Sequence, residues 1–158
     1  MLELPAEISP QQTQQLIRRC AEIKCSLTAQ DPEDRGVRQT LNFGHTFGHA
    51  IEFLSGYSLL HGEAVAAGMG MITRAAVKLG YADASVLKTL QEALQRRGLP
   101  DKADYPPEAI LAAAAADKKR SGAMQTLVMP REVGRTELIS VSRERFSEIV
   151  YAAAGDEI

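Results

Sequence analysis

All three histidines of this 158-residue chain lie in one stretch, 42–61, which reads NFGHTFGHAIEFLSGYSLLH. His45 and His49 are four residues apart, so on a helix, at about 100° per residue, their imidazoles share a face. Imidazoles at this spacing can converge on a single metal ion. In zinc proteases a glutamate general base follows the first histidine, but here that residue is Thr46. The spacing therefore predicts metal binding without protease chemistry.

His61 precedes or opens the next predicted helix, where the helix dipole disfavours protonation and keeps the imidazole neutral for metal ligation. Catalytic zinc normally takes three protein ligands and leaves one position open. Glu63 has two interpretations: it complements the dipole of its own helix, or it orients His61 through a hydrogen bond. The alternative for every one of these histidines is a hydrogen-bonded structural residue.

Asn42 and Glu52 fall on the same predicted helical face as the two paired histidines. Arg38, one turn before Asn42, is placed to reach the mouth of such a site and would suit an anionic substrate. Three further basic residues are candidates for the same task, against the alternative that they are solvated surface: Lys24, Lys118 and Lys119.

The helix that carries these residues is predicted to begin between Gln39 and Asn42 and to end near Leu54, with Gly56 as its C-terminal cap. Its opposite face is apolar and should hold it to a core: Phe43, Phe47, Ile51 and Leu54. Gly44 and Gly48 lie between the two faces. Because glycine inside a helix costs about 1 kcal/mol relative to alanine, they indicate close approach by a backbone, a ligand or a neighbouring helix.

A second helix is predicted from Gly62 to Leu79, uncharged between Glu63 and Arg74 and rich in small residues. We interpret it as the buried hub of a helical domain. Before the histidine stretch, Ser9 should cap a helix that runs to about Thr28. One face of that helix should be buried and the other basic, and we expect its two cysteines to be reduced, small buried groups: Cys20 and Cys25.

The remaining elements are short. Further helices should follow Asp83, the Pro106–Pro107 pair and Ser142, and two strands should lie near 124–129 and 137–141 around a turn with Pro130 and Gly134. Five or six helices and a short β-hairpin predict a mainly α fold in a single domain, 1–158.

Composition excludes two classes of function. Eighteen basic and twenty acidic residues give a net charge of −2, without the basic run expected of a nucleic-acid-binding protein. The longest apolar run, Ala64–Thr73, is far shorter than the roughly 20 residues of a membrane span, and the first residues lack a signal-peptide pattern. We expect a cytoplasmic protein with no membrane contact.

Two motifs, LNFGHTFGHAIE and LLHGEAVAAGM, closely resemble the signature of 3-dehydroquinate synthases. The similarity extends upstream through LIRRCAEIK and RGVRQ and downstream through DKKRSGAMQTLVMPREVG. It covers nearly the whole chain.

The resemblance implies an NAD- and zinc-dependent lyase of the shikimate pathway, with Co²⁺ as an alternative metal. Such enzymes, which serve chorismate and aromatic amino acid biosynthesis, convert 3-deoxy-arabino-heptulosonate 7-phosphate to 3-dehydroquinate and phosphate. They transiently oxidise an alcohol with NAD, eliminate phosphate, reduce the carbonyl again and close the ring by an aldol step. The resemblance also implies a homodimer for the full-length enzyme.

Carried over by resemblance, His45 and His61 are the two metal-binding histidines, and His49 faces the substrate with a part in proton handling. Asn42 resembles the contact to a substrate hydroxyl. The remaining correspondences are basic: Lys24 and Arg38 for the substrate carboxylate, and Lys118 or Lys119 for the phosphate.

In that family the third metal ligand, a glutamate, and the nucleotide-binding glycines come from an N-terminal α/β domain, which we expect to be absent here. The chain then corresponds to the helical C-terminal, metal-binding half of the enzyme, inactive alone. Three alternatives stay open: another sugar-phosphate cyclase, the metal-binding domain of an iron-type alcohol or glycerol dehydrogenase, and a non-catalytic helical interaction module.

Overall fold

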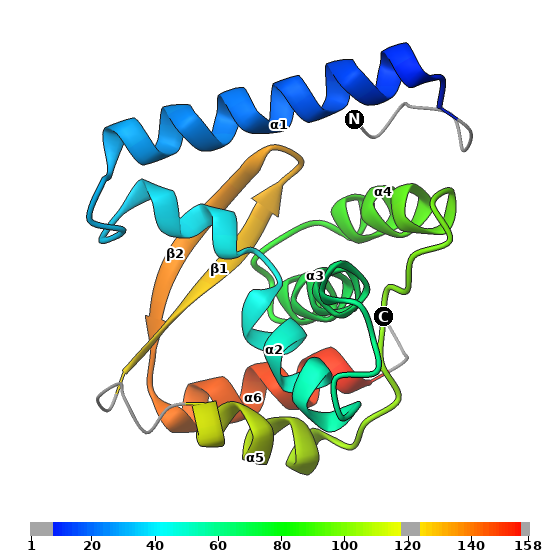
Figure 1. Cartoon of the computed structure of the whole chain (residues 1–158). Helices are drawn as coiled ribbons and strands as arrows, with labels where there is room; N and C mark the ends of the chain where they lie inside the picture. The colour runs from blue at the N-terminus through cyan, green and yellow to red at the C-terminus, as the bar shows by residue number, and fades with distance from the viewer. Residues whose placement is uncertain (1–7, 118–123, 156–158) are drawn as a thin grey trace.

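The computed structural model of the chain describes residues 8–117 and 124–155. Within these ranges it has six α-helices, one 3₁₀ helix and one two-stranded antiparallel sheet (Figure 1). The elements are α1 (Pro10–Gln30), η1 (Val37–Asn42), α2 (His45–Leu54), α3 (His61–Lys78), α4 (Ala84–Gln95), α5 (Pro107–Asp117), β1 (Gln125–Glu132), β2 (Arg135–Val141) and α6 (Arg143–Ala154). The predicted mainly α fold with a short hairpin is confirmed.

Helix α3 lies at the centre of the core, as predicted, and contacts α2, α4, α6 and β1. Most of its residues between Ala64 and Ala76 are buried, and Phe47 and Ile51 of α2 join the same apolar cluster. Among the residues that the structure describes, no helix combines the length and hydrophobicity needed to cross a bilayer.

Small residues bring the backbones of α2 and α3 together. A Cβ on Gly48 would lie 3.1 Å from Cα of Val65, and a Cβ on Gly68 would lie 2.2 Å from the carbonyl oxygen of Gly44. The close approach predicted from the paired glycines is confirmed, and the neighbour is helix α3.

The predicted start of the histidine-bearing helix, between Gln39 and Asn42, is wrong. The chain forms the separate helix η1, and α2 begins only at His45. Gly44 separates the two helices with a φ of 79°, in the left-handed region that favours glycine. It therefore caps α2 rather than lying inside it, and Asn42 belongs to a different element from the histidines.

The end of α2 follows the prediction. Gly56, with a φ of 62°, comes directly after the C-cap residue Ser55. The backbone N–H of Tyr57 donates to the carbonyl of Glu52 at 2.9 Å and that of Gly56 to the carbonyl of Phe53 at 3.1 Å, which together form a Schellman motif.

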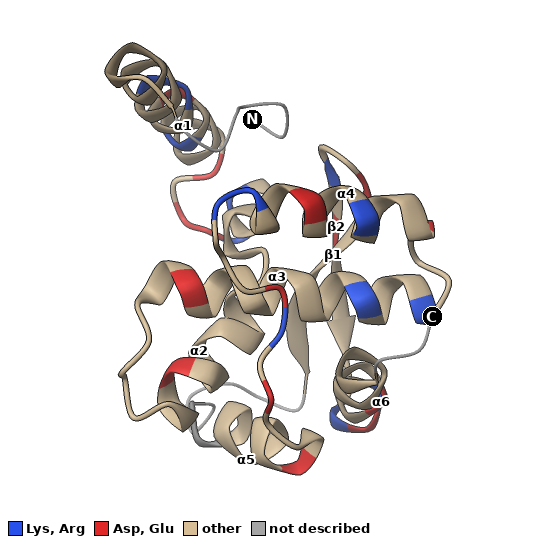
Figure 2. Cartoon of the chain, turned by 90° about the vertical axis from the view of Figure 1, so that its right-hand side faces the viewer, with Lys and Arg blue, Asp and Glu red and all other residues tan. Residues whose placement is uncertain are grey.

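Helix α1 has the predicted capping box, in which Ser9 and Gln12 exchange hydrogen bonds of 2.9 and 3.2 Å. Its predicted buried face is wrong, because no residue of α1 is buried. Figures 1 and 2 show α1 mostly apart from the helical body, with its contacts at η1. Cys20 and Cys25 are free, as predicted, but exposed. The spacing of the apolar residues of α1 shows that they share one face of the helix, but spacing alone does not show whether another part of the protein covers that face.

The hairpin differs from the prediction at Pro130, which lies in β1 beside a bulge and not in the turn. A two-stranded sheet tolerates this proline because each strand has an edge that needs no ladder hydrogen bond. The turn residue is Gly134, with a φ of 85°. Ser142 caps α6 as predicted, since its Oγ accepts the backbone N–H of Arg145 at 3.3 Å.

Candidate metal centre

Helices α2 and α3 bring the three imidazoles together. His45 opens α2, His49 follows one turn later on the same face, and His61 opens α3. The ring centroids are 5.6 Å apart for His45 and His49, 5.4 Å for His45 and His61, and 6.0 Å for His49 and His61. Three imidazoles from two helices therefore form one cluster.

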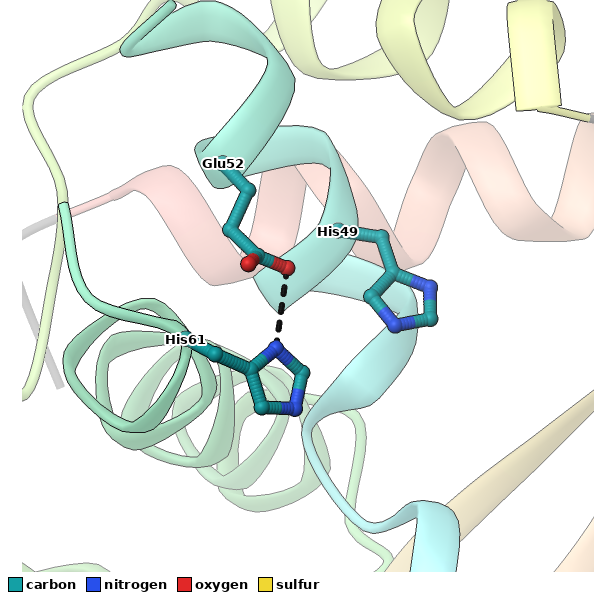
Figure 3. Close-up of side chains that lie close together, drawn as sticks. All are labelled: His49, Glu52 and His61. Atoms are coloured by element: carbon teal, nitrogen blue, oxygen red, sulfur yellow. Dashed lines mark hydrogen bonds and ion pairs between the residues drawn. The ribbon is translucent and has the colours of Figure 1, made fainter. Parts of the chain in front are cut away.

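Glu52 adds a carboxylate to this group (Figure 3). Its Oε2 lies 3.0 Å from Nδ1 of His61. Ligand atoms of His49, Glu52 and His61 all lie within 4.8 Å of one another, so these residues could hold a metal ion. The side chain of Glu52 is only 17% exposed whereas that of His61 is 56% exposed, so the centre is open on the His61 side.

Glu63 does not contact His61 in the manner considered from the sequence. Its Oε2 accepts the backbone N–H of Leu60 at 3.1 Å, which caps the start of α3. The contact to His61 comes from Glu52 instead. Sequence reasoning placed Glu52 on the polar face but missed this contact, because it joins two elements across the turn after α2. The available signal was that Glu52 follows His49 by three residues on that face.

The surroundings of His45 favour a neutral ring with a defined tautomer. Its Nδ1 lies 3.3 Å from the carbonyl oxygen of Phe43, and a carbonyl only accepts, so the contact requires the proton on Nδ1 and leaves a lone pair on Nε2. Burial lowers the pKa of His45, the Phe43 carbonyl opposes this, and positive charge on His49 or His61 would lower it further. The neutral imidazole is the form that binds metal.

Two predicted substrate contacts lie in η1, directly before α2. Asn42 is exposed at the end of η1. Arg38 is held at both ends: its backbone N–H donates to Oδ2 of Asp31 at 3.1 Å, and its Nη1 donates to the carbonyl of Pro32 at 3.1 Å. Helix η1 thus places an amide and a guanidinium on the segment that leads into the histidines.

The other basic candidates are farther along the chain. Lys24 is exposed on α1, the helix that contacts η1. Lys118 and Lys119 lie outside the described residues. Their predicted roles toward substrate therefore stay predictions.

Sequence comparisons identify relatives of the chain. The family described as 3-dehydroquinate synthase C-terminal matches residues 2–120. The chain is 41% identical over 143 residues to the 3-dehydroquinate synthase of Dictyoglomus thermophilum. The aligned region covers 89% of this chain and 40% of that protein. It is 39% identical over 137 residues to that of Thermoanaerobacter sp. (strain X514), covering 85% and 38%. The chain thus spans about two fifths of the length of these curated relatives.

Solved structures with the same fold include two other enzymes. A 2-epi-5-epi-valiolone synthase from Streptomyces hygroscopicus subsp. jinggangensis, with NAD⁺ and Zn²⁺ bound, superposes with a TM-score of 0.76 at 24% identity over 91% of this chain and 40% of its own. A 2-deoxy-scyllo-inosose synthase complexed with carbaglucose-6-phosphate, NAD⁺ and Co²⁺ gives 0.74 at 25% identity over 90% and 42%. The helical arrangement of this chain is therefore one that these synthases share.

Proposed function

The chain belongs to the 3-dehydroquinate synthase C-terminal family, and on that premise we propose that it forms the metal-binding part of a 3-dehydroquinate synthase. The proposed reaction converts 3-deoxy-arabino-heptulosonate 7-phosphate to 3-dehydroquinate and phosphate in the shikimate pathway. One observation carries the proposal: the imidazoles of His45 and His61, from the two family-like motifs, have centroids only 5.4 Å apart.

His45 and His61 are the proposed ligands of Zn²⁺ or Co²⁺. The residues fit such an ion, because Nδ1 of each ring faces an oxygen acceptor and the other ring nitrogen keeps its lone pair. When bound, the metal would act as a Lewis acid toward substrate hydroxyls while NAD accepts the hydride. The third protein ligand is proposed to be a carboxylate from a part of the enzyme outside this chain.

The neighbouring residues then have distinct tasks toward the substrate. His49, on the same face as His45, is proposed to move a proton near the leaving phosphate. Asn42 would bind a substrate hydroxyl, and Arg38 together with Lys24 would bind the carboxylate. Lys118 or Lys119 would stabilise the negative charge that develops on the phosphate.

NAD binding and the third ligand are proposed to come from an N-terminal α/β domain of the complete enzyme. The support is that this chain spans about two fifths of the length of its relatives. Two glycines of α3, Gly68 and Gly70, are engaged elsewhere: Gly68 lies against α2, and a Cβ on Gly70 would lie 1.9 Å from the carbonyl oxygen of Asp101. They therefore cannot form a phosphate-binding loop, and we expect the chain alone to be inactive.

The second candidate is another sugar-phosphate cyclase. The chain is 25% identical to a 2-deoxy-scyllo-inosose synthase and 41% identical to a 3-dehydroquinate synthase. This difference favours the first candidate, as does the presence of both Lys24 and Arg38, which suit a substrate that carries a carboxylate.

A chimera tests the proposal. This chain would replace the matching segment of the Dictyoglomus thermophilum enzyme, and phosphate release from 3-deoxy-arabino-heptulosonate 7-phosphate would be measured with NAD and Zn²⁺ present. We expect release by the chimera and none by the isolated chain. A His49→Ala chimera should retain the metal and lose most of the rate. A folded chimera that binds NAD and zinc but leaves this substrate intact would contradict the proposal.

A further inference from the structure

We propose that Glu52 is a positioning residue for the metal centre. Its carboxylate accepts a hydrogen bond from Nδ1–H of His61 and thereby presents Nε2 of the same ring to the metal. The inference rests on the proposed function, in which His61 is a metal ligand, and it assigns to Glu52 a task that neither motif similarity nor spacing assigned to it.

The contact itself defines the tautomer of His61. Oε2 of Glu52 lies 3.0 Å from Nδ1 of His61, the ordinary length of a hydrogen bond. An ionised carboxylate has no proton to donate, so a neutral imidazole must carry its proton on Nδ1. Figure 3 shows the second ring nitrogen of His61 on the side away from the carboxylate. That nitrogen then has a free lone pair, because the proton is held on the other one.

The turn after α2 fixes Glu52 in place. Its carbonyl accepts the backbone N–H of Tyr57 at 2.9 Å and the hydroxyl of Ser55 at 2.9 Å. The side chain of Glu52 is only 17% exposed, whereas that of His61 is 56% exposed, so the surrounding protein holds the carboxylate more closely than the ring. The same turn leads the chain back toward α2 and on to His61, which explains how Glu52 and His61, nine residues apart in sequence, come into contact.

His45 provides an independent parallel. Its Nδ1 faces the carbonyl oxygen of Phe43 at 3.3 Å, which also places the proton on Nδ1. Both proposed ligands are thus prepared to bind metal through Nε2. Histidine ligands in metalloproteins usually donate their other N–H to a carboxylate or a carbonyl in this way. Of the two acceptors, only Glu52 is a side chain and can be replaced.

Direct ligation by Glu52 is the competing interpretation, because ligand atoms of His49, Glu52 and His61 lie within 4.8 Å of one another. Around a tetrahedral zinc ion with bonds of about 2.0–2.1 Å, ligand atoms lie about 3.3 Å apart. The 3.0 Å separation between Glu52 and His61 is shorter and fits a hydrogen bond better. The hydrogen-bonding interpretation also leaves His49 available for proton transfer.

Imidazole ¹⁵N–¹H spectra of the chain at pH 8, metal-free and zinc-loaded, test the proposal. We expect the Nδ1–H tautomer of His61 in the metal-free chain and a retained Nδ1–H after zinc is added. Glu52→Met should shift His61 toward the Nε2–H tautomer and weaken zinc binding about 10- to 100-fold. Glu52→Gln, whose amide oxygen can still accept, should show a smaller change in both.

Glu63→Gln is the matched control, since Glu63 caps α3 without touching the ring of His61, and its tautomer should be unchanged. Circular dichroism and thermal unfolding would verify that each variant folds. An Nε2–H tautomer of His61 in the unsubstituted chain, or loss of its Nδ1–H on zinc binding, would overturn the proposal. Absence of zinc binding with an intact Nδ1–H tautomer would instead contradict the proposed metal ligands and leave the role of Glu52 toward His61 standing.

Discussion

His45, His49 and His61 illustrate what residue spacing can predict. The shared face of His45 and His49 follows from one helical turn, and the structure has their ring centroids 5.6 Å apart. The approach of His61 depends on how two helices pack, and the sequence indicated it through the place of His61 at a predicted helix start and through the resemblance of the two motifs. The carboxylate partner of His61 could not be predicted, since Glu52 and Glu63 are both near in sequence and only the turn after α2 decides between them.

The proposed division of labour among the histidines predicts different effects of their removal. His45→Ala and His61→Ala should each weaken zinc binding by more than about 100-fold, because loss of a direct ligand should exceed the 10- to 100-fold effect of losing a ligand's hydrogen-bond partner. His49→Ala should leave the affinity nearly unchanged. Competition with a chelator measures all three. A His49→Ala variant that loses zinc as completely as His45→Ala would contradict the assignment.

At the scale of elements, capping residues were the most reliable guide. Ser9, Gly56 and Ser142 mark helix ends as predicted, because each cap is a local hydrogen-bond or backbone requirement. The start of α2 was missed because Gly44 was interpreted as a packing residue inside a helix. Gly44 does two things. Its left-handed φ of 79° separates η1 from α2, and its backbone lies against α3.

The contact between α2 and α3 predicts that Gly68→Ala is destabilising. The new Cβ would lie 2.2 Å from the carbonyl oxygen of Gly44 and 2.7 Å from the backbone nitrogen of Gly48, so the helices must separate. We expect a loss of about 1–3 kcal/mol in the free energy of unfolding together with weaker zinc binding. Urea denaturation measures the first.

Gly62→Ala is the control for that substitution, because nothing lies within 4 Å of its Cβ position. Its stability should be equal or up to about 1 kcal/mol higher, as alanine favours the helix. Equal stability of Gly68→Ala and Gly62→Ala would show that the two helices do not depend on this close contact.

Asp31 organises the loop before η1 and gives a pH-dependent prediction. The backbone N–H of Arg35 lowers the pKa of this carboxyl, burial opposes the effect, and the N–H groups of Gly36 and Arg38 lower it further. Its stabilising contribution should be complete above the pKa of an unfolded aspartate, about 3.9, and be lost as the pH falls through the lower folded value. The stability difference between the unsubstituted chain and Asp31→Asn should therefore shrink from pH 6 to pH 2.5. A difference that is constant with pH in thermal unfolding would refute the role of Asp31.

At the scale of the whole molecule, the sequence predicted the fold class and the hub helix but not the surroundings of α1. The apolar residues of α1 repeat every three or four positions, yet none of them is buried. Amphipathic spacing depends only on the helix itself, whereas burial depends on the surface that covers it. The chain spans about two fifths of its relatives' length.

That relation to a larger enzyme predicts that the isolated chain does not bind NAD. Gly68 and Gly70, whose spacing resembles part of a nucleotide loop, lie against the backbones of Gly44 and Asp101. Calorimetry with NAD should show no measurable heat of binding, while the chimera described above should bind it. Stoichiometric NAD binding by the 158-residue chain would contradict the proposed division between two domains.

The most direct test of the account is the position of the metal in this chain. Crystals grown with Zn²⁺ would be measured at the zinc absorption edge. We predict an anomalous peak about 2.0–2.1 Å from Nε2 of His45 and of His61, with Nδ1 of His61 still hydrogen-bonded to Glu52. A peak that contacts neither ring, or contacts only one of them, would contradict the account.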